Sequence, residues 1–379
     1  MTKVMTVVGT RPEIIRLSRV IRRLDETVDH VLVHTGQNWD RMLSDVFFDE
    51  LELRKPDRFL GIDTSSLGRV LGGVLAGVEE AIKDEQPDAL LVLGDTNSCI
   101  AALMARRMKV PVYHMEAGNR CFDLNVPEET NRRMVDHVSD FNLVYTEHAR
   151  RNLLAEGLHP RRIVHTGSPM REVLEHYRPR IESSGVLDRL QLEAGGYFLV
   201  SAHREENVDD PERLGLLLDC LRTVRDQWKL PVLVSTHPRT RKRLEQHAED
   251  PTSLEGIAFH EPFGFFDYVH LQMKAKCTLS DSGTISEESA VLDFPAVTLR
   301  DSIERPEALE TGAIVMARLD PRAVIESVTC VIDNSGSPTV CPADYMVRNT
   351  SETVVNYILS TVNVHASWDG IRSNKGRDQ

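Results

Sequence analysis

The chain has 379 residues, of which 41% are hydrophobic and 27% are charged, a composition typical of globular proteins. Its formal net charge of −13 argues against a general binder of nucleic acid or of anionic membranes, because such surfaces need a basic excess. The length exceeds the size at which one hydrophobic core usually stops growing, so we expect two domains.

Six cysteines are spread along the chain without C-x-x-C spacing, and a chain of this size needs no disulfides to hold its core. We therefore expect reduced thiols in a cytoplasmic protein. A strand is predicted at residues 3–9, so close to the first residue that a cleavable export signal is not expected. No apolar run approaches the ~20 residues needed to span a bilayer, so neither a membrane nor a nucleic acid is an expected partner.

Residues 3 to about 168 alternate between strand and helix patterns, which predicts a parallel α/β sheet. The first helix is expected to begin with a capping box from Thr10 to Glu13, with Pro12 in its first turn. Its core-facing stripe is predicted to comprise Ile14, Leu17, Ile21 and Leu24. Strands are expected near 3–9, 29–35, 88–94, 110–114, 141–146 and 162–166.

The pattern breaks between Glu175 and Gly196, where Pro179 and small polar residues predict an interdomain linker. Strands are then expected near 197–200, 232–234, 257–259, 277–279 and 296–299, and helices near 212–228, 267–275, 285–293 and 321–333. We therefore predict an α/β protein with two Rossmann-like, doubly wound domains that face a cleft, residues 1–175 and 176–350. A last helix near 351–363, in the stretch 351–379, is expected to complete the first domain and to precede a frayed polar tail.

Acidic residues follow two apolar strands of the first half. Asp95 comes after the run 89–93, and Glu116 comes after the run that starts at Val110. Ligands of open parallel sheets bind outside the carboxyl ends of the strands, so both carboxylates are expected to face one cleft. Asp95 alone could cap a helix and Glu116 alone could be a solvated loop residue. The presence of Glu128 and Arg132 shortly afterwards favours a functional site.

Each half also contains a turn that could bind an anion. In the first half the turn is Gly9–Glu13, which includes Arg11. In the second half it is Ser282-Gly283-Thr284, where Gly283 would allow a close backbone approach and Thr284 with Glu287 would form a second capping box. A purely structural turn is the alternative in the second half.

Basic residues in the second half support an anionic ligand there. His203 and His237 each follow a predicted strand, and Arg305 lies in the sequence Glu304-Arg305-Pro306-Glu307. Glu288, one turn into a predicted helix, could hydrogen-bond a ribose diol. Its alternative role is that of a carboxylate favoured by the helix dipole.

Several common motifs are missing from the sequence. No G-x-G-x-x-G fingerprint follows a strand, since Gly72 to Gly77 lies inside a helical pattern. There is no G-x-x-x-x-G-K-[ST] loop and no H-E-x-x-H motif. A bound dinucleotide, a P-loop ATPase and a zinc protease centre are thus disfavoured, and we expect neither a cofactor nor a metal.

Taken in order, these motifs resemble the non-hydrolysing UDP-N-acetylglucosamine 2-epimerase family over nearly the whole chain. The stretches that carry the resemblance include Gly9–Glu13, Gly94-Asp95-Thr96, Glu116-Ala117-Gly118, Pro127-Glu128-Glu129, His203-Arg204, Asp281-Ser282-Gly283 and Glu304–Glu307. The resemblance implies two Rossmann-like domains of the glycosyltransferase-B type. It also implies inversion of C2 of a UDP-2-acetamido sugar, with the UDP-sugar as the partner.

The resemblance extends to single residues. By similarity, Asp95, Glu116 and Glu128 match the family's catalytic acids, while UDP contacts are matched by Arg11, His203, Ser282, Gly283 and Glu288. The expected catalytic set is therefore Asp95, Glu116, Glu128, Arg132 and His203. The expected UDP-sugar contacts are Arg11, His237, Ser282, Gly283, Thr284, Glu288 and Arg305.

Within the family, the stretches 8–18, 95–99, 116–123 and 201–208 resemble the branch called UDP-N-acetyl-L-fucosamine synthase. That branch epimerises UDP-2-acetamido-2,6-dideoxy-L-talose for capsule or O-antigen synthesis. Arg16 stands where many 2-epimerases have Lys, and Gln37-Asn38 stands where a Gln-His pair is usual. Because of these departures, the allosteric UDP-N-acetylglucosamine site of bacterial members is not carried over.

The chemistry agrees with this residue inventory. A C2 proton without an adjacent carbonyl is too weak an acid for direct removal, and no motif for an oxidising dinucleotide is present. UDP would therefore leave from C1 while one carboxylate takes the C2 proton, and it would re-add to the glycal as a second acid protonates the other face.

Arg132, four residues after Glu128, is the expected counter-charge to these acids. Cys121 and Phe122 could form an apolar wall for a 6-methyl group or serve plain packing.

Three other readings stay open. A UDP-N-acetylglucosamine 2-epimerase would use the same residues on another sugar. A glycosyltransferase of the same build would need an acceptor groove and usually one base, and a nucleotide-sugar sensor would need no acid at all. Three acids favour the epimerase. We also expect a homodimer.

Overall fold

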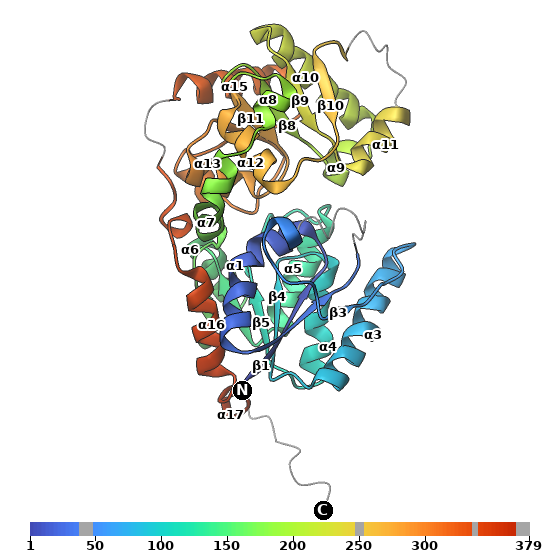
Figure 1. Cartoon of the computed structure of the whole chain (residues 1–379), viewed down its shortest axis with the longest axis vertical. Helices are drawn as coiled ribbons and strands as arrows, with labels where there is room; N and C mark the ends of the chain where they lie inside the picture. The colour runs from blue at the N-terminus through green and yellow to red at the C-terminus, as the bar shows by residue number, and fades with distance from the viewer. Residues whose placement is uncertain (38–47, 247–253, 336–339, 369–379) are drawn as a thin grey trace, which may run out of the picture. The chain divides into compact units, whose positions relative to one another are not determined.

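The protein is described here by a computed structural model that covers residues 1–37, 48–246, 254–335 and 340–368, so Asn38 lies outside the described residues. The chain divides into two compact units, Met1–Val173 with Val347–Gln379, and Leu174–Met346. Each unit is built on a parallel sheet with helices packed against it (Figure 1). The predicted fold class, two parallel-sheet α/β units, is confirmed.

The first unit contains, in its described part, a seven-stranded sheet of order β3-β2-β1-β4-β5-β6-β7. The strands are β1 (Lys3–Val8), β2 (Asp29–His34), β3 (Arg58–Phe59), β4 (Ala89–Leu93), β5 (Val112–Met115), β6 (Phe141–Val144) and β7 (Ile163–His165). The helices are α1 (Arg11–Thr27), α3 (Leu67–Glu85), α4 (Ala101–Arg107), α5 (Pro127–Val138), α6 (Glu147–Ala155), α16 (Thr350–Thr361) and α17 (His365–Trp368), with short 3-10 helices at Asn97–Ile100 and Pro160–Arg162. Helix α7 (Met170–Glu182) leads into the second unit.

The second unit contains a six-stranded sheet of order β10-β9-β8-β11-β12-β13 among the residues described. The strands are β8 (Phe198–Ser201), β9 (Val232–Ser235), β10 (Ile257–His260), β11 (Cys277–Ser280), β12 (Ala296–Leu299) and β13 (Val315–Ala317). The helices are α8 (Val186–Leu190), α9 (Glu205–Val208), α10 (Pro211–Trp228), α11 (Pro238–Gln246), α12 (Phe265–Lys274), α13 (Ile285–Leu292), α14 (Glu307–Glu310) and α15 (Pro321–Asp333), with a 3-10 helix at Ala343–Tyr345.

Each sheet has a point where the chain reverses its direction of winding. In the first unit β1 pairs with β2 on one side and with β4 on the other. In the second unit β8 pairs with β9 on one side and with β11 on the other. Loops that leave the carboxyl ends of strands at such a point diverge, and open parallel sheets bind their ligands there.

The first helix shows how sequence produces this arrangement. Glu13 accepts a hydrogen bond from the Thr10 backbone N–H at 2.7 Å, which confirms the predicted capping box. The four residues of the predicted stripe, Ile14, Leu17, Ile21 and Leu24, are all buried. Strand β4 (Ala-Leu-Leu-Val-Leu) is buried throughout, as expected for a parallel strand covered on both faces.

The predicted linker between Glu175 and Gly196 is wrong over most of its length. Helix α7 continues to Glu182 with Pro179 inside it, and α8 follows after a short turn. Tyr177 is buried and packs its ring against Phe265 and Phe266, with centroids 6.2 and 5.4 Å away. This packing within the second unit outweighs the cost of a proline in the helix interior, which sequence propensity alone could not reveal.

The C-terminal helix belongs to the first unit, although it lies far from the rest of that unit in sequence. Helix α16 lies beside α1 (Figure 1), and Ile358 on its inner face is fully buried. Tyr113 of β5 and Thr361 of α16 share a hydrogen bond of 2.7 Å between their hydroxyl groups. Residues 369–379 of the predicted polar tail lie outside the described residues. No described helix is both long enough and apolar enough to cross a membrane.

Replacing Ile358 by Ala should lower the free energy of unfolding by about 2–5 kcal/mol, because it removes a fully buried side chain and leaves a cavity. Replacing Asn356, which is exposed on the same helix, by Ala should change it by less than about 0.5 kcal/mol. Urea denaturation of the two variants measures the difference. Equal stability of both would show that α16 contributes little to the first unit.

Candidate active site

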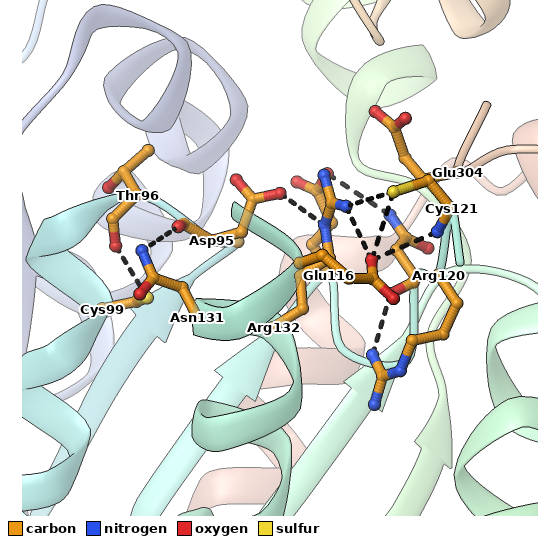
Figure 2. Close-up of polar contacts among 12 residues, drawn as sticks. Asp95, Thr96, Cys99, Glu116, Arg120, Cys121, Asn131, Arg132 and Glu304 are labelled. Carbon is orange, nitrogen blue, oxygen red and sulfur yellow. Dashed lines mark hydrogen bonds and ion pairs between the residues drawn. The ribbon is translucent and has the colours of Figure 1, made fainter. Parts of the chain in front are cut away.

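The turns that follow β1, β4 and β5 lie next to one another, because these strands are neighbours in the sheet. The turn after β1 carries Arg11, which is the first residue of α1 and is half-buried. Asp95 lies in the turn after β4, and Glu116 directly follows β5. The structure therefore brings these three predicted site residues to one edge of the sheet, where Figure 2 shows Asp95 and Glu116 near Arg132.

Glu13 ties the first two turns together. Its carboxylate is buried and accepts hydrogen bonds from the backbone N–H groups of Gly9 and Thr10, each at 2.7 Å. Its other oxygen accepts from the hydroxyls of Thr96, at 2.8 Å, and Ser98. Burial raises the pKa of Glu13, although these hydrogen bonds act in the opposite direction. Glu13 thus fixes the turn that bears Arg11 to the turn that bears Asp95.

Helix α5 holds the Asp95 turn from the other side. Arg132 Nε lies 2.7 Å from Asp95 Oδ2, and Arg132 Nη1 lies 3.0 Å from Glu129 Oε2 (Figure 2). Asn131 donates from its side chain to the Asp95 carbonyl at 2.9 Å. Arg132 therefore lies against Asp95, in agreement with its expected role as a counter-charge to the acids.

Glu116 adopts an unusual backbone conformation, with φ of 63°, in the left-handed region that few residues other than glycine occupy. Its side chain is largely buried and forms an ion pair with Nη1 of Arg16 from α1. Asn119 lies 3.5 Å from its other oxygen. A carboxylate held on strained backbone by an arginine is typical of a functional position.

Glu128 lies half-buried in the first turn of α5, and Arg132 follows it by four residues.

The loop before α5 differs from the expected apolar wall. Cys121 Sγ lies 3.3 Å from a Glu129 oxygen and 3.5 Å from Arg132 Nη1, so its surroundings are polar. Phe122 is 70% exposed. Neither the apolar wall nor the plain packing role is supported for Phe122.

In the second unit, residues from three adjacent strand ends gather around Asp281, which is fully buried. Its carboxylate accepts hydrogen bonds from the backbone N–H groups of His203 and Arg204 and from the Asn207 side chain, all at 3.0–3.1 Å. The rings of His203 and His237, whose centroids are 5.8 Å apart, lie beside each other past the ends of β8 and β9. The structure therefore brings both predicted histidines together.

The turn after β11 differs in detail from the prediction. Thr284 has helical backbone angles and no side-chain capping bond, so the second capping box is wrong. The Glu287 side chain points to Arg305 instead of to the helix start, since its Oε2 lies 3.6 Å from Arg305 Nε. A Cβ atom on Gly283 would lie only 2.3 Å from Arg305 Nη1, so a larger residue there would force the Arg305 side chain to shift. Ser282 and Thr284 share a hydrogen bond of 3.0 Å between their hydroxyls.

Glu288 of α13 is also in this cluster. Its side chain is largely buried and accepts a hydrogen bond from Gln272 Nε2 at 2.7 Å. Arg305 is 3% exposed and lies 3.7 Å from Glu304 Oε1. In the part of the chain that the structure describes, no group of three or more His, Cys, Asp and Glu side chains could hold a metal ion.

The model of a family described as UDP-N-acetylglucosamine 2-epimerase matches residues 22–359 of the sequence. The chain belongs to this family. It is an isomerase, a non-hydrolysing UDP-sugar 2-epimerase, which favours that reading over the transferase and the sensor.

Three individual proteins illustrate the similarity. The structure of UDP-N-acetylglucosamine 2-epimerase from Rickettsia bellii has 43% sequence identity and a TM-score of 0.90, over 97% of this chain and 99% of that one. The Methanocaldococcus jannaschii UDP-GlcNAc 2-epimerase in complex with UDP-GlcNAc and UDP has 33% identity and a TM-score of 0.88, over 95% and 100% of the two chains. UDP-2,3-diacetamido-2,3-dideoxy-D-glucuronate 2-epimerase from Pseudomonas aeruginosa is 35% identical over 331 residues, 86% of this chain and 91% of its own.

Some contributors to the site of this epimerase were not predicted. Glu129 and Asn131 hold the Asp95 turn and the loop before α5 through the contacts given above. Glu13 was recognised only as part of a capping box, and the partner of Arg16 was not foreseen. The available signal was the unbroken run of polar residues from Glu128 to Arg133 in the first turns of α5.

Replacing Glu129 by Gln should lower the free energy of unfolding at pH 7 by about 1.5–3 kcal/mol, the usual worth of hydrogen bonds to a charged group. Burial opposes ionisation, but the Cys121 N–H and Arg132 lower the pKa of Glu129 below 4.5. A lowered pKa in the folded state stabilises the fold above the unfolded pKa, and this stabilisation is lost as pH falls through the folded value. The difference between the two proteins should therefore shrink below about pH 4.5.

Thermal or denaturant unfolding from pH 3 to pH 7 measures this difference, with the exposed Glu80→Gln as the matched control. A constant difference across the range would contradict an ionised, stabilising Glu129.

Proposed function

We propose that this epimerase inverts C2 of UDP-2-acetamido-2,6-dideoxy-L-talose and forms UDP-N-acetyl-L-fucosamine for capsule or O-antigen synthesis. The observation that carries the proposal is the ion pair between Arg16 and Glu116. Arg16 stands where many 2-epimerases have Lys, and the resemblance to the L-fucosamine branch includes this stretch. Arginine is planar and presents several fixed donors, so exchanging it with lysine beside an acid alters how that acid is held.

We assign proton transfer to Asp95, Glu116 and Glu128. UDP leaves from C1 as one carboxylate takes the C2 proton, and UDP re-adds to C1 of the glycal while a second acid protonates C2 from the other face. Arg132 next to Asp95 offsets the repulsion among carboxylates and a diphosphate. His203 is assigned a catalytic role in the second unit, where it lies beside Asp281.

We assign UDP binding to Arg11, His237, Ser282, Gly283, Thr284, Glu288 and Arg305. The turn at Gly283 lies at the start of α13, where backbone N–H groups and the positive end of the helix favour phosphate. Glu288 would accept hydrogen bonds from a ribose diol. The Methanocaldococcus jannaschii relative bound to UDP-GlcNAc and UDP supports a nucleotide-sugar ligand. The expected homodimer stays a prediction.

UDP-N-acetylglucosamine is the second candidate substrate, because relatives including the Rickettsia bellii protein carry that name. The two sugars differ at C6, where one presents a methyl group and the other a hydroxyl. The Pseudomonas aeruginosa relative, named for a diacetamido-glucuronate, supports the view that similar chains differ in sugar preference.

Changing Asp95, Glu116 or Glu128 to its amide should reduce turnover by roughly 10²–10⁴-fold, the usual share of general acid–base catalysis. Each amide keeps the shape of the side chain but cannot carry the proton. Initial rates of epimer formation measure the loss, and Glu80→Gln serves as the exposed control. Near-normal turnover of any one amide variant would remove that residue from proton transfer.

In heavy water, UDP-2-acetamido-2,6-dideoxy-L-talose should be converted to UDP-N-acetyl-L-fucosamine with deuterium at C2, because the returning proton comes from solvent-exchanged acids. The ratio kcat/KM should be higher for this substrate than for UDP-N-acetylglucosamine under the same conditions. Nuclear magnetic resonance follows both conversions. A higher kcat/KM for UDP-N-acetylglucosamine would refute the proposed substrate, and retention of the original hydrogen at C2 would refute the mechanism.

A further inference from the structure

His114, at the third position of β5, lies buried between two acceptors that belong to different parts of the first unit. Its Nε2 is 2.8 Å from the carbonyl oxygen of Gly94, the residue before Asp95. Its Nδ1 is 2.9 Å from Oδ1 of Asp136, on α5. Both side chains are at most 1% exposed. The imidazole therefore spans from the Asp95 turn to the helix that carries Glu128.

The two groups that face this histidine favour its charged form. A carbonyl oxygen can only accept, so Nε2 carries the proton that points to Gly94, and Nδ1 faces the Asp136 carboxylate at ion-pair distance. Burial opposes the charge, but hydrogen bonds to Asp136 and Gly94 raise the pKa of His114 above 6.5. His114 and Asp136 thus lie at ion-pair distance from each other in the core.

Asp136 also holds the loop that carries Glu116. Its carboxylate accepts the Gly118 N–H at 3.1 and 3.2 Å and an Nη1 proton of Arg120 at 2.7 Å. Glu128, Arg132 and Asp136 recur at four-residue intervals, so they share one face of α5. Asp136 therefore connects Glu116, through its loop, to the helix face on which Glu128 and Arg132 lie.

This loop needs such support because its backbone is unfavourable. Glu116 has φ of 63°, which is unfavourable for a residue with a side chain, whereas Gly118 adopts its φ of 81° without strain. A Cβ on Gly118 would lie 2.4 Å from the Ala149 carbonyl, so the loop is also pressed against α6. Residues in sparsely populated conformations cost about 1–3 kcal/mol each and persist only when surrounding contacts fix them. Asp136 supplies two of these contacts.

We propose that His114 and Asp136 are a positioning pair, which sets the relative placement of the three segments that bear Asp95, Glu116 and Glu128. His114 fixes the Asp95 turn through the Gly94 carbonyl, and Asp136 fixes the Glu116 loop through Gly118 and Arg120. Neither residue takes part in proton transfer. The inference rests on the proposed catalytic roles of the three acids.

The test compares Asp136→Asn with Asp140→Asn. Asp140 is a matched control, because it is also buried in the first unit, accepts a backbone N–H from Val112 at 2.9 Å and pairs with Arg106. Both variants should lose similar thermal stability. Only Asp136→Asn should lower kcat, by about 10–100-fold as expected for misplaced catalytic groups, with KM changed less than about twofold. Hydrogen exchange of the backbone amides of residues 114–120 should accelerate only in Asp136→Asn.

His114→Gln is the second variant, since glutamine can donate to the Gly94 carbonyl but cannot carry a charge to Asp136. It should show the same loss of kcat with unchanged KM. Rates are compared on whichever UDP-sugar the unmodified enzyme converts, so failure of the proposed substrate leaves this comparison intact.

Unchanged kcat in folded Asp136→Asn, or equal losses in Asp136→Asn and Asp140→Asn, would overturn the proposal. If Asp136→Asn fails to fold, His114→Gln decides by the same criteria. If neither variant folds, the pair serves the fold rather than the acids, and the proposal is overturned as well.

Discussion

The first unit depends on one electrostatic constraint, which is that several carboxylates lie close together at the edge of one sheet. Like charges at such distances raise one another's pKa values unless cations or hydrogen-bond donors compensate them. Arginines lie against several of these acids. Arg132 lies against Asp95 and Glu129, and Arg16 pairs with Glu116. A net charge of −13 is therefore compatible with an anionic ligand, because arginines are concentrated next to the acids at this sheet edge.

In the second unit a carboxylate lies among hydrogen-bond donors and cations. The proposed diphosphate site needs donors and cations, yet the fully buried Asp281 lies at the centre of these residues. This carboxylate turns the backbone N–H groups of His203 and Arg204 inward, so it orders the loop that carries the histidine. Arg305 is held by Glu287 and Glu304 behind Gly283, where a larger residue would displace the Arg305 side chain. Acids in this unit act as supports for donors.

The sequence predicted those features that depend on local pattern or on strand ends. The parallel strands follow from continuous apolar runs such as that of β4, and the first capping box follows from Thr10 and Glu13. Asp95, Glu116, His203 and His237 follow strands, so their gathering at sheet edges could be expected. Features that depend on contacts distant in sequence were missed. Pro179 indicated a linker, because the packing of Tyr177 on Phe265 cannot be inferred from the sequence. The predicted capping box at Thr284 is wrong, because the Glu287 side chain lies near Arg305 instead.

Two kinds of carboxylate can be separated in the first unit by what holds them. Glu13, Glu129 and Asp136 are at most 1% exposed and accept backbone N–H groups, from Gly9, Cys121 and Gly118 respectively. A carboxylate bonded to the backbone cannot move without disturbing the loop itself, so these three are suited to support. Asp95 and Glu116 are held by the arginine side chains instead, and the Asp95 side chain is 23% exposed. A side-chain partner can shift with its acid, so this difference agrees with the proton-transfer roles proposed for Asp95 and Glu116 and with a supporting role for the other three.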